Sequence, residues 1–121
     1  MSEFQTAIIW HNQNCSKSRG ACDLLAVRGV DFERRDYIKH PPTRAELESV
    51  LQMMGDAEPA SIVRFGEQQA KDLGLTKQSS RDEILDALVA HPKLIERPIV
   101  ITSEGRAVVG RPPELVLDLF D

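Results

Sequence analysis

The residue best suited to chemistry is Cys15, which lies in a polar segment between an apolar run and an amphipathic stretch. Where a strand meets a helix, the unpaired N–H groups of the first helical turn favour an anion. Lys17 and Arg19 add positive charge nearby, and such surroundings lower the pKa of a thiol and supply thiolate at neutral pH. Because the adjacent Asn14 and Ser16 are polar, we interpret Cys15 as a nucleophile rather than as a packing residue.

Other side chains near Cys15 have distinct expected roles. Ser18 follows three residues later, so its hydroxyl can reach the same helix mouth, and His11, four residues earlier, can orient the loop. Cys22 falls on the apolar face of the expected helix, about 10 Å from Cys15 along the helix axis. A disulfide requires Cα atoms within about 7 Å, so we predict that Cys22 packs in the core and does not pair with Cys15.

The residues that follow Cys15 exclude two familiar kinds of thiol site. Position 18 is serine, so there is no C-x-x-C dithiol, and position 21 is alanine, so the C-x5-R loop of low-molecular-weight phosphatases is missing. The sequence therefore offers a single reactive thiol, which must take electrons from another molecule.

Three arginines in apolar surroundings, Arg64, Arg97 and Arg111, form a second set of candidate residues. Burying an unpaired guanidinium is unfavourable, and guanidinium groups match the geometry of oxyanions. Alternatively, each of the three pairs with one of the 19 acidic residues. The remaining arginines are interpreted as solvated surface charges: Arg28, Arg34, Arg35, Arg44, Arg81 and Arg106.

The elements that position these residues follow from the hydrophobic pattern. Residues 4–10 suit a buried strand, residues 18–28 an amphipathic helix, and residues 30–37 a charged strand at a sheet edge. Residues 98–102 and 106–109 suit a hairpin, and two adjacent prolines then open a final helix. The ends of the chain thus predict a β-α-β unit and a β-β-α unit.

A helical block at about residues 43–91 separates these two units. Capping boxes at residues 43–46 and 80–83 begin its two main helices, with shorter helical stretches between them. About 50 residues would form a marginal core alone, so we read the block as an insertion. The sequence predicts an α/β fold with a single thioredoxin/glutaredoxin-like domain over residues 1–121.

Composition limits the classes of partner. A chain of 121 residues with 41% hydrophobic and 28% charged residues is typical of a globular protein, and its net charge of -4 argues against nucleic acid. No apolar run approaches the roughly 20 residues of a membrane span. With no secretory leader and only two cysteines, we expect a cytoplasmic protein. The scattered histidines and cysteines lack the spacing of a metal site.

The motifs resemble those of the glutaredoxin-coupled arsenate reductase family. Residues 11–19, HNQNCSKSR, are similar to its active-site loop H-N-P-x-C-x-x-S-R, with Gln13 in place of the usual proline. Residues 94–100, LIERPIV, are similar to its L-I-x-R-P-I-V segment, and residues 110–114, GRPPE, to its R-P-x-E motif. Arg64 falls where that family has an arginine in its helical block. The chain ends soon after the last motif, as in the short branch of the family.

The resemblance implies that Cys15 attacks arsenate and that Arg64, Arg97 and Arg111 bind the oxyanion. It implies that Arg97–Pro98 is a cis peptide facing Cys15. It also implies that the substrate loop includes His11, Asn12, Ser18, Arg19 and Pro98. No tightly bound cofactor is implied. Glutathione would resolve the cysteine–arsenic adduct as a co-substrate, and glutaredoxin would reduce the mixed disulfide.

Two alternatives to arsenate reduction stay open. One is a glutathione-linked thiol oxidoreductase without arsenate activity. The other is an Spx-type regulator that binds RNA polymerase, although such proteins typically carry C-x-x-C and this chain has Ser18 instead. The oligomeric state is open, with a monomer as the default expectation.

Overall fold

The computed structural model describes residues 6–120, so residues 4 and 5 of the predicted first strand and residue 121 lie outside the described residues. The elements in chain order are β1 (Thr6–His11), α1 (Ser16–Arg28), β2 (Asp31–Asp36), α2 (Arg44–Met53), the 3-10 helix η1 (Pro59–Ile62), α3 (Gln68–Asp72), α4 (Arg81–Ala90), η2 (Pro92–Leu94), β3 (Ile99–Thr102), β4 (Ala107–Val109) and η3 (Pro113–Phe120).

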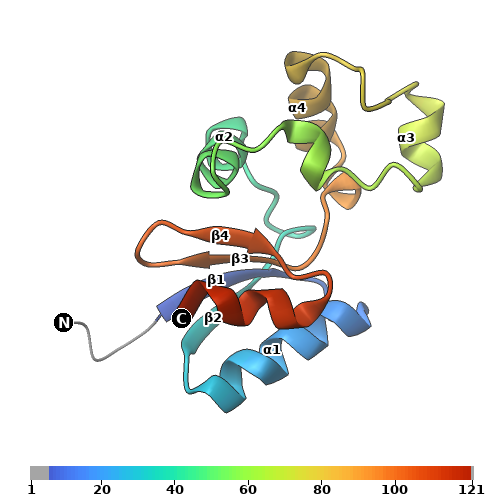
Figure 1. Cartoon of the computed structure of the whole chain (residues 1–121). Coiled ribbons are helices and arrows are strands. Elements are labelled where there is room, and N and C mark those ends of the chain that lie inside the picture. The colour runs from blue at the N-terminus through green and yellow to red at the C-terminus, as the bar shows by residue number, and fades with distance from the viewer. Residues whose placement is uncertain (1–5, 121) are drawn as a thin grey trace. The chain divides into compact units, whose positions relative to one another are not determined.

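Two compact units make up the described chain (Figure 1). Residues 6–40 and 97–120 form the sheet unit, and residues 41–96 form the helical unit, close to the predicted block at about 43–91. The description of residues 1–121 as a single domain with an insertion stays a prediction.

The sheet unit is built on four strands in the order β2-β1-β3-β4. β1 and β2 are parallel, and α1 connects them, while β1 with β3 and β3 with β4 are antiparallel. The predicted β-α-β and β-β-α order is therefore confirmed, as is the edge position of the charged second strand. The parallel pairing brings the C-terminal ends of β1 and β2 to the same side of the sheet, so the segments that follow them are neighbours.

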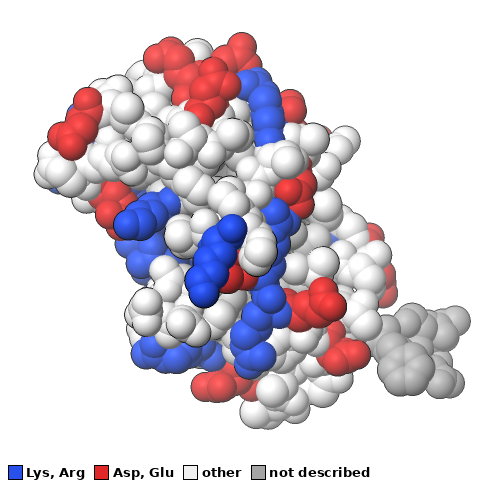
Figure 2. Space-filling view, turned by 180° about the vertical axis from the view of Figure 1, so that it is seen from behind, with Lys and Arg blue, Asp and Glu red and all other residues white. Residues whose placement is uncertain are grey.

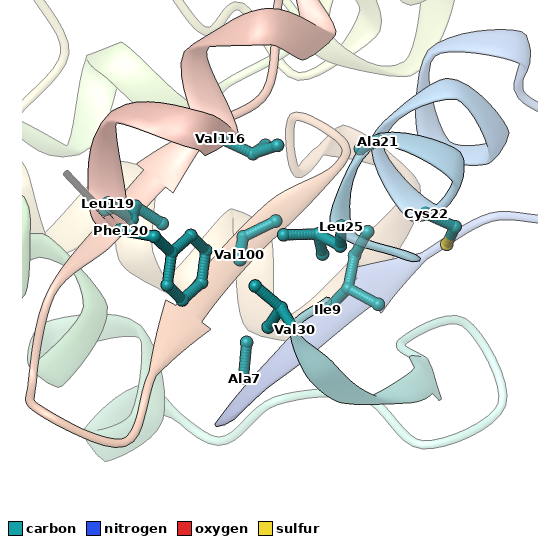
Figure 3. Close-up of a cluster of buried hydrophobic side chains, with 10 residues drawn as sticks. All are labelled: Ala7, Ile9, Ala21, Cys22, Leu25, Val30, Val100, Val116, Leu119 and Phe120. Carbon is teal, nitrogen blue, oxygen red and sulfur yellow. The ribbon is translucent and has the colours of Figure 1, made fainter. Parts of the chain in front are cut away.

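The core of the sheet unit lies between the sheet and the two helices α1 and η3 (Figure 3). Ile9 of β1, Leu25 of α1 and Val116 of η3 are fully buried in it. Burying an aliphatic side chain of this kind is worth about 1.5–3 kcal/mol. Cys22 belongs to the same cluster and is 3% exposed, which confirms its predicted packing. α1 ends at Gly29, whose φ of 83° is a left-handed conformation that glycine adopts readily.

The last helix, η3, differs in kind from the expected α-helix. It is a 3-10 helix that buries Val116, Leu119 and Phe120. Arg28 donates to the carbonyl of Phe120 at 2.6 Å, and Arg106 donates to the carbonyl of Leu119 at 3.0 Å. Both arginines are exposed, as predicted for surface charges. They also satisfy carbonyls at the end of the chain that a helix leaves free.

In the helical unit, both predicted capping boxes are present. Thr43 and Glu46 begin α2, and Ser80 and Glu83 begin α4, each pair with reciprocal side-chain and backbone hydrogen bonds. The buried residues of the two helices recur at helical spacing: Leu47, Val50 and Leu51 in α2, and Ile84, Leu85 and Leu88 in α4.

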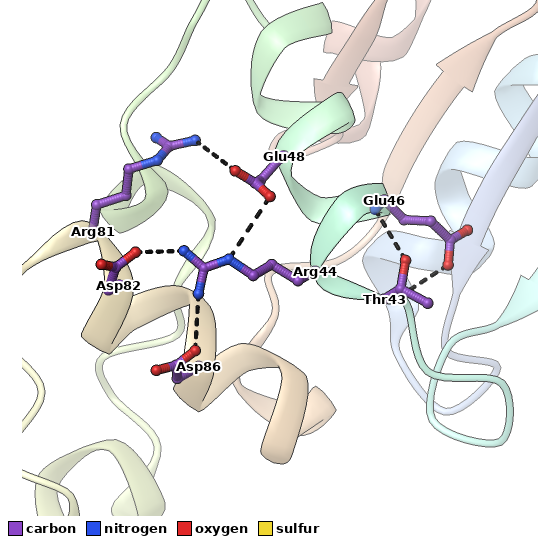
Figure 4. Close-up of polar contacts among 7 residues, drawn as sticks. All are labelled: Thr43, Arg44, Glu46, Glu48, Arg81, Asp82 and Asp86. Atoms are coloured by element: carbon purple, nitrogen blue, oxygen red, sulfur yellow. Dashed lines mark hydrogen bonds and ion pairs between the residues drawn. The ribbon is translucent and has the colours of Figure 1, made fainter.

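Arg44 links these two helices (Figure 4). It lies within ion-pair distance of Asp82 and of Asp86 on α4, and its Nε is 3.7 Å from Glu48 on its own helix. Arg81 in turn approaches Glu48 at 3.9 Å. Arg44 is a solvent-accessible surface charge, as predicted, and the packing of α2 beside α4 also places carboxylates around it.

The surface in Figure 2 shows acidic side chains interspersed with basic ones, as a chain with 15 Lys and Arg against 19 Asp and Glu leads us to expect. Within residues 6–120, no helix has both the length and the apolar character needed to cross a membrane.

Candidate active site

Cys15 is the N-cap residue of α1, at the predicted junction between β1 and the first helix. Its backbone is extended, its N–H donates to the carbonyl of Asn12 at 2.9 Å, and its own carbonyl accepts from the N–H of Arg19 at 3.1 Å. The residue is partly exposed, so the thiol is fixed at the start of the helix while remaining accessible to a reactant.

The surroundings of Cys15 lower the pKa of its thiol to about 7. Partial burial raises this pKa, but the backbone N–H of Ser18, the side chain of Arg97 and the backbone N–H of Lys17 together outweigh burial. The N–H groups of the first turn of α1 and the guanidinium of Arg97 thus stabilise the thiolate of Cys15 at neutral pH. The thiolate is the form of cysteine that acts as a nucleophile.

The charged side chain beside Cys15 is Arg97, which the resemblance placed at this site, and not that of Lys17 or Arg19. Lys17 acts through its backbone N–H, and Arg97, distant in sequence, supplies the side-chain charge. Arg19 instead donates from Nη1 to the carbonyl of Gln13 at 2.7 Å. The predicted contribution of the first helical turn is therefore present, whereas the expected charge effect of Arg19 is not, because its side chain folds back onto the loop and stabilises its shape.

Asn12 and Ser18 stabilise the loop that carries Cys15 through hydrogen bonds. The Oδ1 of Asn12 accepts from the N–H of Asn14 at 2.9 Å, and the N–H of Asn12 donates to the hydroxyl of Ser18 at 3.3 Å. Ser18 has no exposed surface, so its hydroxyl is a fixed internal acceptor. These contacts give both residues a structural role in holding the loop.

His11 is partly buried beside Cys22, with its Nδ1 3.7 Å from the sulfur. Burial lowers the pKa of His11, as does the charge of Arg34, although Asp36 opposes this. Burial raises the pKa of Cys22, against the opposing effect of Arg34. Both groups are therefore uncharged at neutral pH, and His11 connects the end of β1 to α1.

Arg97 and Arg111 lie together in the sheet unit with Cys15. Arg97 interacts with the Cys15 thiol, and its pKa is raised because the favourable contacts with Cys15 and Tyr37 outweigh the opposing effect of burial. Nη1 of Arg111 donates to the carbonyl of Arg97 at 2.9 Å. Arg97–Pro98 is cis, as the resemblance implied, and Arg111–Pro112 is cis as well. Pro98 is buried, and its carbonyl accepts from the N–H of Gly110 at 2.8 Å.

Arg64 belongs to the helical unit and has acidic partners there. Its Nε lies 3.2 Å from Glu67, and its Nη1 lies 3.4 Å from Glu96. This is the ion-pair alternative that the sequence left open. Within residues 6–120, by contrast, Arg97 and Arg111 pair with no carboxylate. The convergence of all three arginines on Cys15 stays a prediction for Arg64.

Tyr37 is a site residue that the sequence reasoning missed. It directly follows β2, it has no exposed surface, and it is near enough to Arg97 to raise the pKa of that guanidinium. Parallel strands end on the same side of a sheet, so a tyrosine just after the second strand could have been placed near the loop after the first. Among the described residues, no three His, Cys, Asp or Glu side chains cluster in a way that could hold a metal ion.

Comparison with known proteins assigns the family. Residues 10–119 match the model of the ArsC family. The chain belongs to the ArsC family. A relative named arsenate reductase from Neisseria meningitidis serogroup A is 41% identical over 107 residues, which cover 88% of this chain and 91% of the relative. Another arsenate reductase, from Haemophilus influenzae, is 36% identical over 116 residues, 95% of this chain and 99% of the relative.

A solved structure of an ArsC-family relative supports the same assignment. The structure of an arsenate reductase from Vibrio cholerae superposes with a TM-score of 0.89 and is 39% identical, covering 96% of this chain and 98% of the other. The thioredoxin-like fold predicted for this ArsC-family chain is therefore confirmed. The site holds a thiol of lowered pKa beside a guanidinium group, an arrangement that suits attack on an anionic electrophile.

Proposed function

We propose that this chain reduces arsenate to arsenite through the Cys15 thiolate. The observation that carries the proposal is the placement of Cys15 at a helix N-terminus against Arg97, which lowers the thiol pKa to about 7. The same guanidinium can receive the charge of an oxyanion that approaches the sulfur. Relatives from Neisseria and Haemophilus that carry the name arsenate reductase support this choice of oxyanion.

In the proposed reaction the Cys15 thiolate attacks arsenic(V), and an arsenate oxygen leaves as water after taking up protons. A glutathione thiolate then attacks the Cys15 sulfur, so the electron pair of the sulfur–arsenic bond stays on arsenic and arsenite departs. The thiolate of a glutaredoxin then attacks the glutathione sulfur of the mixed disulfide, so that a disulfide between glutaredoxin and glutathione forms and Cys15 leaves as a thiolate for another cycle. No resident cofactor is needed, and the reducing cytoplasm supplies the two thiol partners.

Arg97 and Arg111 are the proposed oxyanion ligands in the sheet unit. Neither pairs with a carboxylate within residues 6–120, so their charge is available to an anion. Arg64 is proposed as a third ligand, and binding through it requires the oxyanion to compete with Glu67 and Glu96. Of the three, Arg97 is therefore expected to contribute most.

The test is an assay of arsenate reduction with glutathione and glutaredoxin as electron donors. We expect turnover by the wild type, loss of turnover in Cys15→Ser, and near wild-type turnover in Cys22→Ser. Cys22 is the matched control, since it is the other cysteine and is buried in the core. Turnover that survives in Cys15→Ser, or its absence from the wild type, would contradict the proposal.

A second candidate is a glutathione-linked thiol oxidoreductase without arsenate activity. It is favoured by the two carboxylates that Arg64 already has, because they leave fewer guanidinium groups free for an oxyanion. In the same assay this candidate predicts a mixed disulfide of Cys15 with glutathione that glutaredoxin reduces, with no arsenite formed.

A further inference from the structure

Gln13 and Asn14 form the centre of a tight turn that leads into Cys15. The N–H of Cys15 donates to the carbonyl of Asn12 at 2.9 Å, the hydrogen bond that closes a β-turn over residues 12–15. The orientation of the central peptide, here the one between Gln13 and Asn14, distinguishes type I from type II β-turns. The conformation of the chain just before the thiol therefore depends on what holds this peptide.

Both polar ends of the Gln13–Asn14 peptide are hydrogen-bonded to side chains. The carbonyl of Gln13 accepts from Nη1 of Arg19 at 2.7 Å. The N–H of Asn14 donates to Oδ1 of Asn12 at 2.9 Å. Rotation of the peptide would turn the carbonyl away from Arg19 and the N–H away from Asn12, so both hydrogen bonds would be lost together.

The residue types at the centre of the turn make the rotated form accessible. A type II turn requires a positive φ at its third residue, and asparagine tolerates that conformation better than most residues do. Among the described non-glycine residues only Asp56 has a positive φ, so Asn14 does not adopt the type II form. Gln13 also leaves its own φ free, whereas the proline of the related motif would fix it. Side-chain hydrogen bonds are therefore needed to select one form of the turn.

Arg19 is held in the position that this selection requires. Its own N–H donates to the carbonyl of Cys15 at 3.1 Å, so its backbone belongs to the first turn of α1 while its guanidinium reaches back to Gln13. Arg19 pairs with no carboxylate within residues 6–120. The guanidinium is thus committed to the negative end of a peptide dipole that lies close to the thiol in the chain.

We propose that Arg19 is a positioning residue that holds the turn before Cys15 in one conformation through the carbonyl of Gln13. The inference rests on the proposed function, in which Cys15 is the nucleophile, and deepens it. A single conformation of the turn keeps the start of α1 in place, and with it the N–H groups of Lys17 and Ser18 that stabilise the thiolate. Arg19 acts on the sulfur only through this turn.

The experiment compares Arg19→Gln with the parent protein, both in a Cys22→Ser background so that only the Cys15 thiol titrates. Thiolate absorbance is followed against pH. We expect Arg19→Gln to raise the Cys15 pKa by roughly half to one unit, the shift that corresponds to one lost hydrogen bond. Arg106→Gln is the matched control and should leave the pKa unchanged, because the exposed Arg106 also donates to a backbone carbonyl, that of Leu119 at 3.0 Å.

Two further measurements separate the effect of the turn from the charge of Arg19. At about 1 M salt the screening length falls to about 3 Å, so a charge effect would disappear, whereas an effect of the turn persists. Hydrogen exchange at the Asn14 N–H should become about three- to tenfold faster in Arg19→Gln, while exchange at Leu25 within α1 stays unchanged. A pKa rise that vanishes in salt, an unchanged exchange rate at Asn14, or an equal pKa rise in Arg106→Gln would overturn the inference.

A double-mutant cycle with Asn12→Ala tests whether Arg19 and Asn12 hold the same peptide. Since either substitution frees the peptide, the second should add little to the pKa rise caused by the first. Fully additive rises would show that the two side chains act separately and would contradict the proposed role of Arg19. Thermal unfolding of each variant separates these outcomes from loss of the fold.

The titration and the exchange measurement need no substrate, so their outcome is independent of arsenate turnover. Where the wild type reduces arsenate, Arg19→Gln should lower kcat/KM below pH 7 by about three- to tenfold, the loss of thiolate that the pKa rise implies. If the wild type proves inactive on arsenate, the proposed function fails while the titration and exchange still decide the role of Arg19.

Discussion

At the scale of single residues, the proposed chemistry depends on one thiol and one guanidinium that are distant in sequence. Cys15 begins α1, and Arg97 precedes the buried strand β3. The backbone N–H groups at the helix mouth and the Arg97 side chain both stabilise the thiolate, while partial burial opposes them. The thiol is therefore partly ionised near pH 7. A thiol of this pKa suits a residue that attacks as a thiolate and is later released from a disulfide as a thiolate.

The first prediction concerns the pH dependence of activity. The Cys15 pKa of about 7 means that the thiolate fraction, and with it kcat/KM, rises with pH up to about 7 and then levels off. Below that pH, kcat/KM should fall about tenfold per unit, since each unit removes nine-tenths of the thiolate. Rates measured between pH 5 and 9 should match the absorbance titration of the thiolate. A profile that still rises steeply above pH 8 would contradict the assignment of the nucleophile.

The second prediction separates the charge of Arg97 from its shape. Arg97→Lys keeps the positive charge beside Cys15 but loses the planar two-pronged donor. The Cys15 pKa should change little, whereas arsenate turnover should fall by about 10²–10³-fold, the usual effect of losing one donor aimed at a transition state. Arg106→Lys is the control, because Arg106 donates to the carbonyls of Leu119 and Asp118 in η3. Equal losses in both variants would indicate a general effect of replacing arginine.

At the scale of elements, close packing around Gly110 holds the strand that follows Arg97. A Cβ atom at position 110 would lie 2.9 Å from Cγ1 of Val116 and 3.0 Å from Cγ of Pro98. Gly110 also donates its N–H to the carbonyl of Pro98 at 2.8 Å. The segment after β4, the helix η3 and the proline next to Arg97 are therefore packed so tightly that only glycine fits between them.

The third prediction follows from that packing. Gly110→Ala should destabilise the protein by about 1–3 kcal/mol, as overpacking of a well-filled site typically does, and should also raise the Cys15 pKa by displacing Pro98 and Arg97. Gly20→Ala is the matched control within α1, where the added Cβ meets only Pro113 at an ordinary 3.5 Å. It should stabilise the helix by about 0.5–1 kcal/mol. Denaturant unfolding of the two variants checks the opposite signs.

At the scale of the whole molecule, ionisation of Cys15 is linked to the free energy of unfolding. The folded pKa lies below the ordinary thiol value, so the folded state binds the proton less tightly than the unfolded state does. The stabilisation from the thiolate is fully present above the unfolded pKa and is lost as the pH falls toward the folded value of about 7.

The fourth prediction states this linkage as a measurement. The free energy of unfolding of the wild type, minus that of Cys15→Ser, should increase between about pH 7 and pH 9. Because Cys15 is partly exposed, the increase should be modest. Cys22 is present in both proteins, so its own titration cancels from the difference. A difference that decreases over this range would show that the folded state favours the protonated thiol.

Much of the fold is determined by local sequence pattern. The first strand, its helix and the edge strand follow from hydrophobic period, and the capping boxes of α2 and α4 follow from a Thr or Ser three residues before a Glu. Cys15 was identifiable because the same pattern places it where a strand ends and a helix begins. Strands, helices and caps depend on residues that are close together in the chain, within one or two helical turns. They can therefore be predicted from the sequence alone.

The resemblance placed Arg97 at the Cys15 site and the local pattern favoured Lys17 and Arg19, and only the tertiary structure decided which of these side chains meets the thiol. The nearby Arg19 turns to the carbonyl of Gln13, while the distant Arg97 reaches Cys15 because β3 pairs with β1 in an antiparallel register. Tyr37 lies where it can influence Arg97 because β2 ends beside β1, and nothing in the residues around Tyr37 indicates that placement. Contacts of this kind depend on strand register and on side-chain direction, which are settled when distant segments pack together and not by the residues adjacent in the chain.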